Sequence, residues 1–150
     1  MANARIGSHP SHGYCIVETL DTTLKQLGSG DSGKVFMCVQ NGSADVEVFL
    51  PKLSTGIAGW QAKFVLKTAA ANDVFITANG SSAAGSTAGD SDSIIALEEA
   101  DTNTVSAAAD AIGFVGGSAT AGDWCELMTD GTSWYAHQHA SADAGASAPG

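Results

Sequence analysis

Residues 123–139 read DWCELMTDGTSWYAHQH, and this stretch decides the fold class. An Asp-Gly pair at 130–131 separates two runs in which apolar and polar residues alternate. Asp-Gly is a strong signal for a two-residue turn between antiparallel strands, and a period of two is the signature of a strand. The stretch therefore predicts a β-hairpin with one apolar face and one face of mixed aromatic, histidine and acidic side chains.

A two-residue turn also predicts which residues of this hairpin oppose each other. A turn one residue longer would slip this register and undo the pairing. The predicted pairs are Leu127 with Trp134 and Cys125 with Ala136 on the core side, and Glu126 with Tyr135 and Trp124 with His137 on the other side.

Similar short runs, separated by turn signals, occupy most of the chain. They predict an all-β, single-domain antiparallel β-sandwich or barrel, jelly-roll-like, over residues 13–139. Residues 1–12 are polar and predict an extended N-terminal arm, and residues 140–150 (ASADAGASAPG) predict a short flexible tail. Strands are expected at 14–20, 33–40, 45–51, 59–68 and 72–80, a strand or short helix at 93–99, a long loop at 80–92, and a helical turn or strand within 101–117.

The composition excludes several classes of function. The net charge is −10, with six basic against sixteen acidic residues, so nucleic-acid binding is not expected. No apolar stretch of about 20 residues predicts a transmembrane helix, and the N-terminus shows no apolar core of a secretory signal. Cys15, Cys38 and Cys125 form no CxxC motif and lie in apolar runs, so we expect buried free thiols.

The motifs of common enzymes are missing from the sequence. It contains no GxSxG, no GKS or GKT phosphate loop and no Rossmann unit, so we nominate no catalytic residue and no cofactor. Asp90 and Asp92 resemble the start of a calcium loop, but Ile95 and Asp101 stand where an EF-hand needs Gly and Glu, which leaves only an adventitious ion.

His137 and His139 share one side of a predicted strand, a spacing that suits a pair of metal ligands. Zinc needs a third and a fourth ligand, for which His9 and His12 or a symmetry axis are candidates. A surface patch of aromatic and histidine side chains is the simpler interpretation, and we predict no metal site.

The three tryptophans are candidates for sugar-stacking platforms or for core residues. Trp60 and Trp134 lie on predicted apolar faces, so we expect them in the core. Trp124 is the freest of the three and the best candidate for an interface or a ligand.

Five segments, taken in order, resemble small β-rich structural proteins of tailed bacteriophages, namely capsid decoration (cement) proteins and modules of head or tail fibres. The resemblance covers about residues 13–138, and its most distinctive motif is D-G-x-x-W-Y. The loop 80–92 and the tail 140–150 have no counterpart in it. The segments are DSGKVFMCV (31–39), VEVFLP (46–51), GWQAKFV (59–65), VFITANG (74–80) and DGTSWYAH (130–137).

The resemblance implies a virion protein that is made in the host cytoplasm and sits on the capsid surface. Such proteins bind the major capsid protein as trimers at local three-fold axes, and their N-terminal arms reach across the shell. The alternatives are a fibre or spike module, which usually joins a longer chain, and a glycan-binding module that uses Trp124 and Tyr135. We expect Ile6, His9, Pro10 and His12 to contact the capsid, and Trp124, Tyr135, His137 and His139 to form the subunit or partner interface.

Overall fold

The computed structural model of this chain describes residues 16–39, 44–69, 71–78, 94–99, 104–142 and 144–147. Within these ranges the protein is all-β, as predicted, and its only helices are two 3₁₀ turns of three residues. None of the described residues forms a helix with the length and hydrophobicity needed to cross a membrane. The expected capsid contacts Ile6, His9, Pro10 and His12 lie outside the described residues, as do Cys15 and the loop 80–92.

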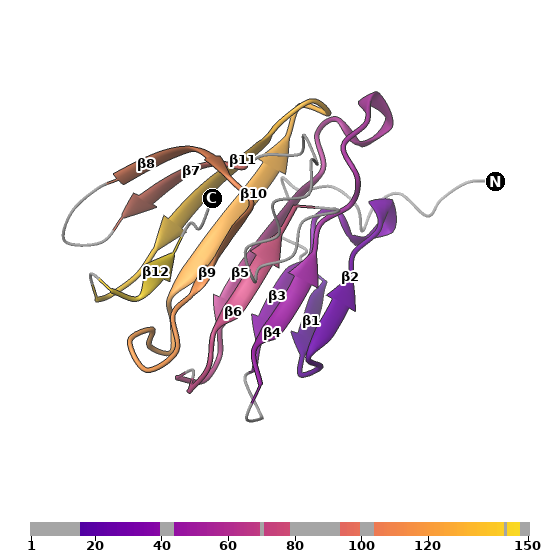
Figure 1. Cartoon of the computed structure of the whole chain (residues 1–150). Coiled ribbons are helices and arrows are strands. Elements are labelled where there is room, and N and C mark those ends of the chain that lie inside the picture. Colours follow the sequence, from indigo (N-terminus) through magenta and orange to yellow (C-terminus); the bar gives the residue numbers. More distant parts are fainter. Residues whose placement is uncertain are drawn as a thin grey trace.

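The strands form two sheets, which Figure 1 shows as two layers. The seven-stranded sheet has the order β1-β3-β5-β10-β11-β7-β8, and the five-stranded sheet has the order β12-β9-β6-β4-β2. The first sheet contains β1 (Val17–Leu20), β3 (Val35–Cys38), β5 (Gln61–Leu66), β7 (Ile94–Glu99), β8 (Thr104–Ala109), β10 (Trp124–Thr129) and β11 (Trp134–His139). The second contains β2 (Leu24–Gln26), β4 (Val46–Phe49), β6 (Val74–Thr77), β9 (Ala111–Phe114) and β12 (Ala146–Ser147).

The first six strands alternate between the two sheets. β1, β3 and β5 pair in parallel in one sheet, and β2, β4 and β6 pair in parallel in the other. Parallel neighbours need a crossover instead of a tight turn, and here each crossover contains a strand of the opposite sheet. The chain therefore winds through both sheets three times, and Val17, Val35 and Lys63 align across neighbouring turns of this coil.

These pairings correct the predicted architecture. Of the ten strand pairs among the described residues, five are parallel, so the expectation of antiparallel sheets is wrong. Each sheet also keeps two edge strands within these residues, so neither closes into a barrel. The second half of the chain is more conventional, because β10 lies between β5 and β11 and is antiparallel to both.

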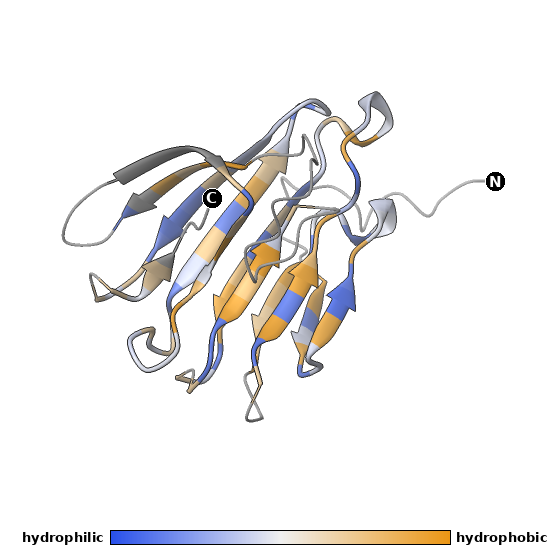
Figure 2. Ribbon diagram, viewed as in Figure 1, coloured by the Kyte–Doolittle hydropathy of each residue, from blue (hydrophilic) through white to orange (hydrophobic). Residues whose placement is uncertain are grey.

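The inward faces of both sheets share one hydrophobic core. Figure 2 shows hydrophobic residues along β4 and β6 in the middle of the five-stranded sheet. The predicted alternation of β5 is confirmed, because Ala62, Phe64 and Leu66 are buried while the residues between them are not. The ring of Phe64 stacks on that of Phe36 in β3, with the ring centroids 5.1 Å apart.

The predicted core positions of two tryptophans and two cysteines are also confirmed. Trp60 and Trp134 are buried and meet edge to face, with their ring centroids 5.3 Å apart. The Trp60 indole donates a hydrogen bond to the Gly28 carbonyl. Cys38 and Cys125 are both fully buried.

At the β1–β2 end of the coil, the inward positions carry charges. Lys25 Nζ lies 2.8 Å from Glu18 Oε1, which joins the two sheets, and Lys34 Nζ lies 2.9 Å from Glu18 Oε2. Hydrogen bonds from Lys25 and Lys34 hold the pKa of Glu18 below its ordinary value. Lys34 also pairs with Asp31 at 2.6 Å, so this open end is closed by a small network of ion pairs.

Part of the segment expected as a flexible tail docks on the five-stranded sheet. Ala146–Ser147 form β12, which pairs with Phe114 and Gly113 of β9. The Val115 amide also donates to the Gly145 carbonyl. Small side chains suit this position, because the backbone here lies close to its neighbours.

Replacing Gly113 with Ala should destabilise the protein, because a Cβ atom at this position would lie 2.1 Å from the Val74 carbonyl oxygen. Forcing atoms into a packed core costs about 1–3 kcal/mol of unfolding free energy. Urea denaturation measures the loss. Gly30→Ala is the matched control, since a Cβ there meets nothing within 4 Å, and its change should stay within about 0.5 kcal/mol. Equal midpoints for the two variants would contradict this account of the β6–β9 contact.

Glu18→Gln should lower the melting temperature at neutral pH, because it removes the charge that pairs with Lys25 and Lys34. The pKa of Glu18 is lower in the folded state than its ordinary value of 4.5. The stabilisation is therefore fully present above pH 4.5 and is lost as the pH falls through the folded value. Melting curves from pH 7 to pH 3 should show the gap between wild type and variant closing. A constant gap would contradict the ion-pair assignment, and Asp21→Asn, at an exposed position, serves as control.

Candidate functional site

The candidate site is the solvent-facing side of the seven-stranded sheet, here called the outer face. It is built from the residues that alternate with the buried ones along β1, β3, β5, β10, β11 and β7. Strand register arranges its centre in three rows. From β5 to β7 they are Val65, Trp124, His139 and Glu99; then Lys63, Glu126, His137 and Leu97; then Gln61, Met128, Tyr135 and Ile95.

The hairpin that carries the centre of this face has a longer turn than the sequence predicts. Thr129 pairs with Trp134, so the loop contains residues 130–133. Asp130 Oδ1 accepts hydrogen bonds from the Thr132 hydroxyl (2.7 Å), the Thr132 amide (2.8 Å) and the Ser133 amide (2.9 Å). These bonds hold the pKa of Asp130 at about 2, well below its ordinary range. Gly131 has a φ of 92°, a left-handed conformation that favours glycine.

The longer turn shifts every predicted pair by two residues. The observed pairs are Leu127 with Ala136, Cys125 with Gln138, Glu126 with His137 and Trp124 with His139. The predicted partners were therefore wrong. A shift of two preserves the side to which each residue points, so the predicted core side and outer side are both confirmed.

Trp124 is enclosed by side chains from the two strands that flank β10. Lys63 Nζ, from β5, lies 4.2 Å from the centroid of the indole ring, a cation–π contact. From β11, the His139 ring stacks on the indole with the centroids 5.9 Å apart. The His137 ring meets the indole edge-on at 5.2 Å. Trp124 is thus the centre of an ordered cluster and not a freely exposed platform.

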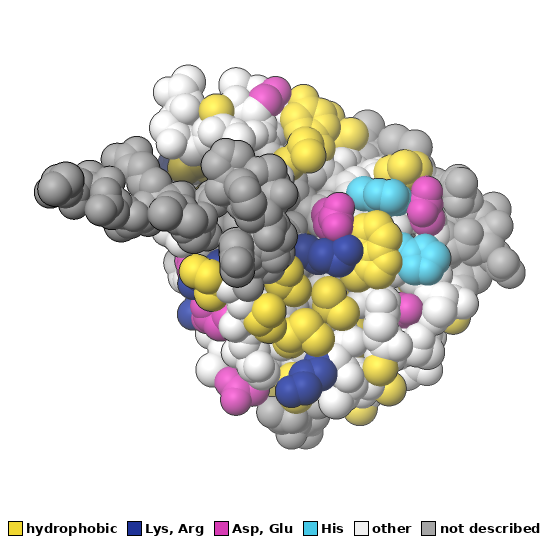
Figure 3. Space-filling view, turned by 180° about the vertical axis from the view of Figure 1, so that it is seen from behind, with side chains coloured by type: hydrophobic (Ala, Val, Ile, Leu, Met, Phe, Trp, Pro, Cys, Tyr) yellow, Lys and Arg dark blue, Asp and Glu magenta, His cyan; other side chains and the backbone are white. Residues whose placement is uncertain are grey.

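Charged groups balance one another around this cluster. Lys63 Nζ is 2.8 Å from Glu126 Oε1, a pair that is partly exposed and holds the lysine beside the indole. His137 Nε2 lies 3.1 Å from Glu99 Oε2, which forms an ion pair when the imidazole is protonated. Figure 3 shows the resulting surface, in which lysine, acidic and histidine side chains border a hydrophobic area.

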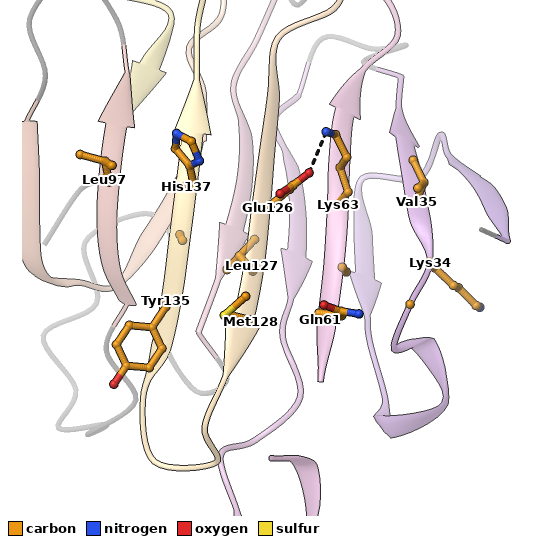
Figure 4. A pocket seen from close by; sticks show the side chains of 13 residues that line it. Lys34, Val35, Gln61, Lys63, Leu97, Glu126, Leu127, Met128, Tyr135 and His137 are labelled. Carbon is orange, nitrogen blue, oxygen red and sulfur yellow. Dashed lines mark hydrogen bonds and ion pairs between the residues drawn. The ribbon is translucent and has the colours of Figure 1, made fainter. Parts of the chain in front are cut away.

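Beside the cluster, the outer face is hollowed into an open groove of about 550 Å³. Its walls come from β3, β5, β10, β11 and β7, and Figure 4 shows the labelled side chains together with the Lys63–Glu126 ion pair. Val35, Met128 and Leu97 give the groove apolar surface, while Gln61 and His137 add polar groups. Its size and mixed lining are typical of surfaces that bind a peptide or a small ligand.

The described residues offer little for covalent or metal chemistry. Burial raises the pKa of the Cys38 thiol to about 12 and that of Cys125 well above its ordinary value, so neither is a ready nucleophile. Within the described ranges, no three His, Cys, Asp or Glu side chains converge as metal ligands. His137 and His139 instead contact the indole of Trp124.

The structure brings all four expected interface residues, Trp124, Tyr135, His137 and His139, onto this outer face. Sequence reasoning missed residues of the same face that lie on other strands. They were recognisable as outward positions of alternating strands, but placing them beside the hairpin requires the strand order. They are Val35, Lys63, Leu97 and Met128.

Asp130→Ala should loosen the hairpin turn, because the carboxylate holds the Thr132 and Ser133 amides. The expected result is faster hydrogen exchange at these two amides and a lower melting temperature. Asp130→Asn should be intermediate, since it keeps an acceptor oxygen but loses the charge. Asp21→Ala is the control at an exposed position. Unchanged exchange in Asp130→Ala would show that the turn does not depend on these hydrogen bonds.

Comparison with known proteins finds no family model and no curated sequence that matches this chain, so its function is argued from the site itself.

Proposed function

We propose that this protein is a structural virion protein, a capsid decoration protein that binds the outer surface of a phage head as a homotrimer. In this role it stabilises the contacts between capsomers and performs no catalysis. The proposal rests on the resemblance of residues 13–138 to such proteins and on the character of the outer face.

The observation that carries the proposal is the exposure of large apolar side chains on the outer face. Met128 is 56% exposed, and Tyr135 and Leu97 lie near it in the groove region. Isolated exposed apolar residues are common, but a contiguous group on one sheet marks an interaction surface. Aromatic residues and methionine are enriched at the centres of such interfaces, while lysine and glutamate are depleted there.

The arrangement of charges suits contact between protein surfaces. Lys63 and Glu126 neutralise each other beside Trp124, so burying this region leaves no unpaired charge from the pair. We assign Trp124, Tyr135, His137 and His139 to the contact between subunits of the trimer. We assign Ile6, His9, Pro10 and His12 to the contact with the major capsid protein. Three such arms on one trimer act together and raise the avidity of attachment.

We further propose that the two sheets form a β-sandwich, a rigid body suited to a mechanical role. Their shared core and the bridge from Gln138 of β11 to the Gly113 carbonyl of β9 support this arrangement. The location that follows from this function is the capsid surface of the virion.

The geometry of Trp124 disfavours the glycan-binding alternative. A sugar-stacking platform needs a free aromatic face, whereas Lys63 lies over this indole and His139 stacks on it. Tyr135 is more exposed, but its hydroxyl donates to Asp130.

The decisive experiment measures binding to phage heads that lack this protein. Wild-type protein should co-sediment with the heads in multiples of three copies per site and raise the temperature at which they rupture. Deleting residues 2–12 should lower occupancy by about tenfold, equivalent to about 1.4 kcal/mol. Replacing the exposed Leu24 on the other sheet with Ser is the control and should bind normally. Failure of the wild-type protein to bind heads would overturn the proposal.

A further inference from the structure

The outer face raises a question that capsid binding does not answer, which is what covers it in the free protein. Its apolar residues extend from the groove to the edge of the sheet, where Val17 of β1 is 62% exposed. Val17 and Val35 are direct neighbours in the parallel pair β1–β3, and Val35 lines the groove. One continuous apolar strip therefore runs from the first described strand to Met128.

The start of the described chain lies at the end of this strip. Ile16 precedes β1, which is an edge strand of the same sheet, and its side chain is 66% exposed. Fifteen residues precede it in the sequence. An extended chain of that length spans up to about 50 Å, whereas six strand spacings cross the whole seven-stranded sheet in about 29 Å. Residues 1–15 are thus tethered beside the strip and are long enough to cross it.

The sequence of this segment complements the outer face. It contains Arg5, the only arginine of the chain, and no Asp or Glu, although the whole chain has a net charge of −10. The outer face carries the carboxylates of Glu99 and Glu126 against the single ammonium of Lys63 near Trp124. The segment also offers Ile6, Pro10 and Tyr14 for the apolar strip.

We propose that residues 1–15 lie across the outer face of their own subunit in the free protein and shield it from a second copy. The arm and the neighbouring subunit then compete for the same surface. When the capsid engages the arm, the face is released, and trimer contacts form on the capsid and not before. The shielding is a property of the free chain, so it stands or falls independently of the capsid role.

The tether makes this shielding effective even when the intrinsic affinity is weak. A short linker gives an effective concentration in the millimolar range. A free peptide of this sequence with a dissociation constant of about 0.1 mM would therefore keep roughly nine faces in ten covered. A second copy at micromolar concentration competes poorly until the arm has another partner.

Paramagnetic relaxation in the full-length chain tests the proposal. A nitroxide is attached at Ser8→Cys in a Cys15→Ser background, and the buried thiols Cys38 and Cys125 remain unlabelled because burial suppresses their reactivity. The label should broaden the amide signals of Glu126, Met128 and Tyr135 and leave those of β4 and β6 sharp. Absence of this broadening, or equal broadening on both sheets, would overturn the proposal.

Two matched variants and one mixing experiment identify the occupant. Met128→Glu places a charge in the apolar strip and should abolish the broadening, whereas Leu24→Glu, at an equally exposed position on the other sheet, should preserve it. A mixture of isotope-labelled protein without nitroxide and unlabelled protein with nitroxide should show no broadening if each arm covers its own subunit. Broadening in the mixture would instead assign the face to another copy's arm and refute shielding within one chain.

Discussion

Parallel strands cannot be joined by a tight turn, and this constraint organises the first half of the molecule. Each strand from β1 to β6 is followed by a strand of the opposite sheet, so two layers grow together as the chain advances. Every inward side chain then meets a partner layer as soon as its turn of the coil is complete. The stacked rings of Phe36 and Phe64, which belong to successive turns, show how this growth builds the core. The later hairpin β10–β11 extends the sheet that the coil has started.

The amino-acid sequence predicts the strands of this fold better than their partners. Alternation along β5 identifies its buried side because burial follows a period of two, which is a local property. Parallel pairing joins residues far apart in the chain and depends on loops of unequal length, so no repeat is visible. The three-residue strand β2 is too short to give a periodic signal, and its place is set by pairing with β4.

The same limit explains what could be predicted of the site. The outward direction of Trp124, Tyr135, His137 and His139 follows from local alternation and survives the two-residue error in register. The error itself arose from Asp130, whose carboxylate organises a four-residue loop where Asp-Gly suggested a tighter turn. The environment of Trp124 was out of reach, because Lys63 approaches it from a strand sixty residues earlier in the chain. Residues on the outer face therefore became a group only when the strand order was known.

The ion pairs at the β1–β2 end also bear on how copies of this protein meet. A coil whose turns stack in parallel invites a further turn from another molecule, and exposed edge strands are common starting points for fibres. Here a new turn would have to pack against Glu18, Lys25 and Lys34 and strip water from their charges. The charged end thus terminates the stack and guards against end-to-end polymerisation. Association is directed to the broad side of the sheet, where growth stops at a closed ring.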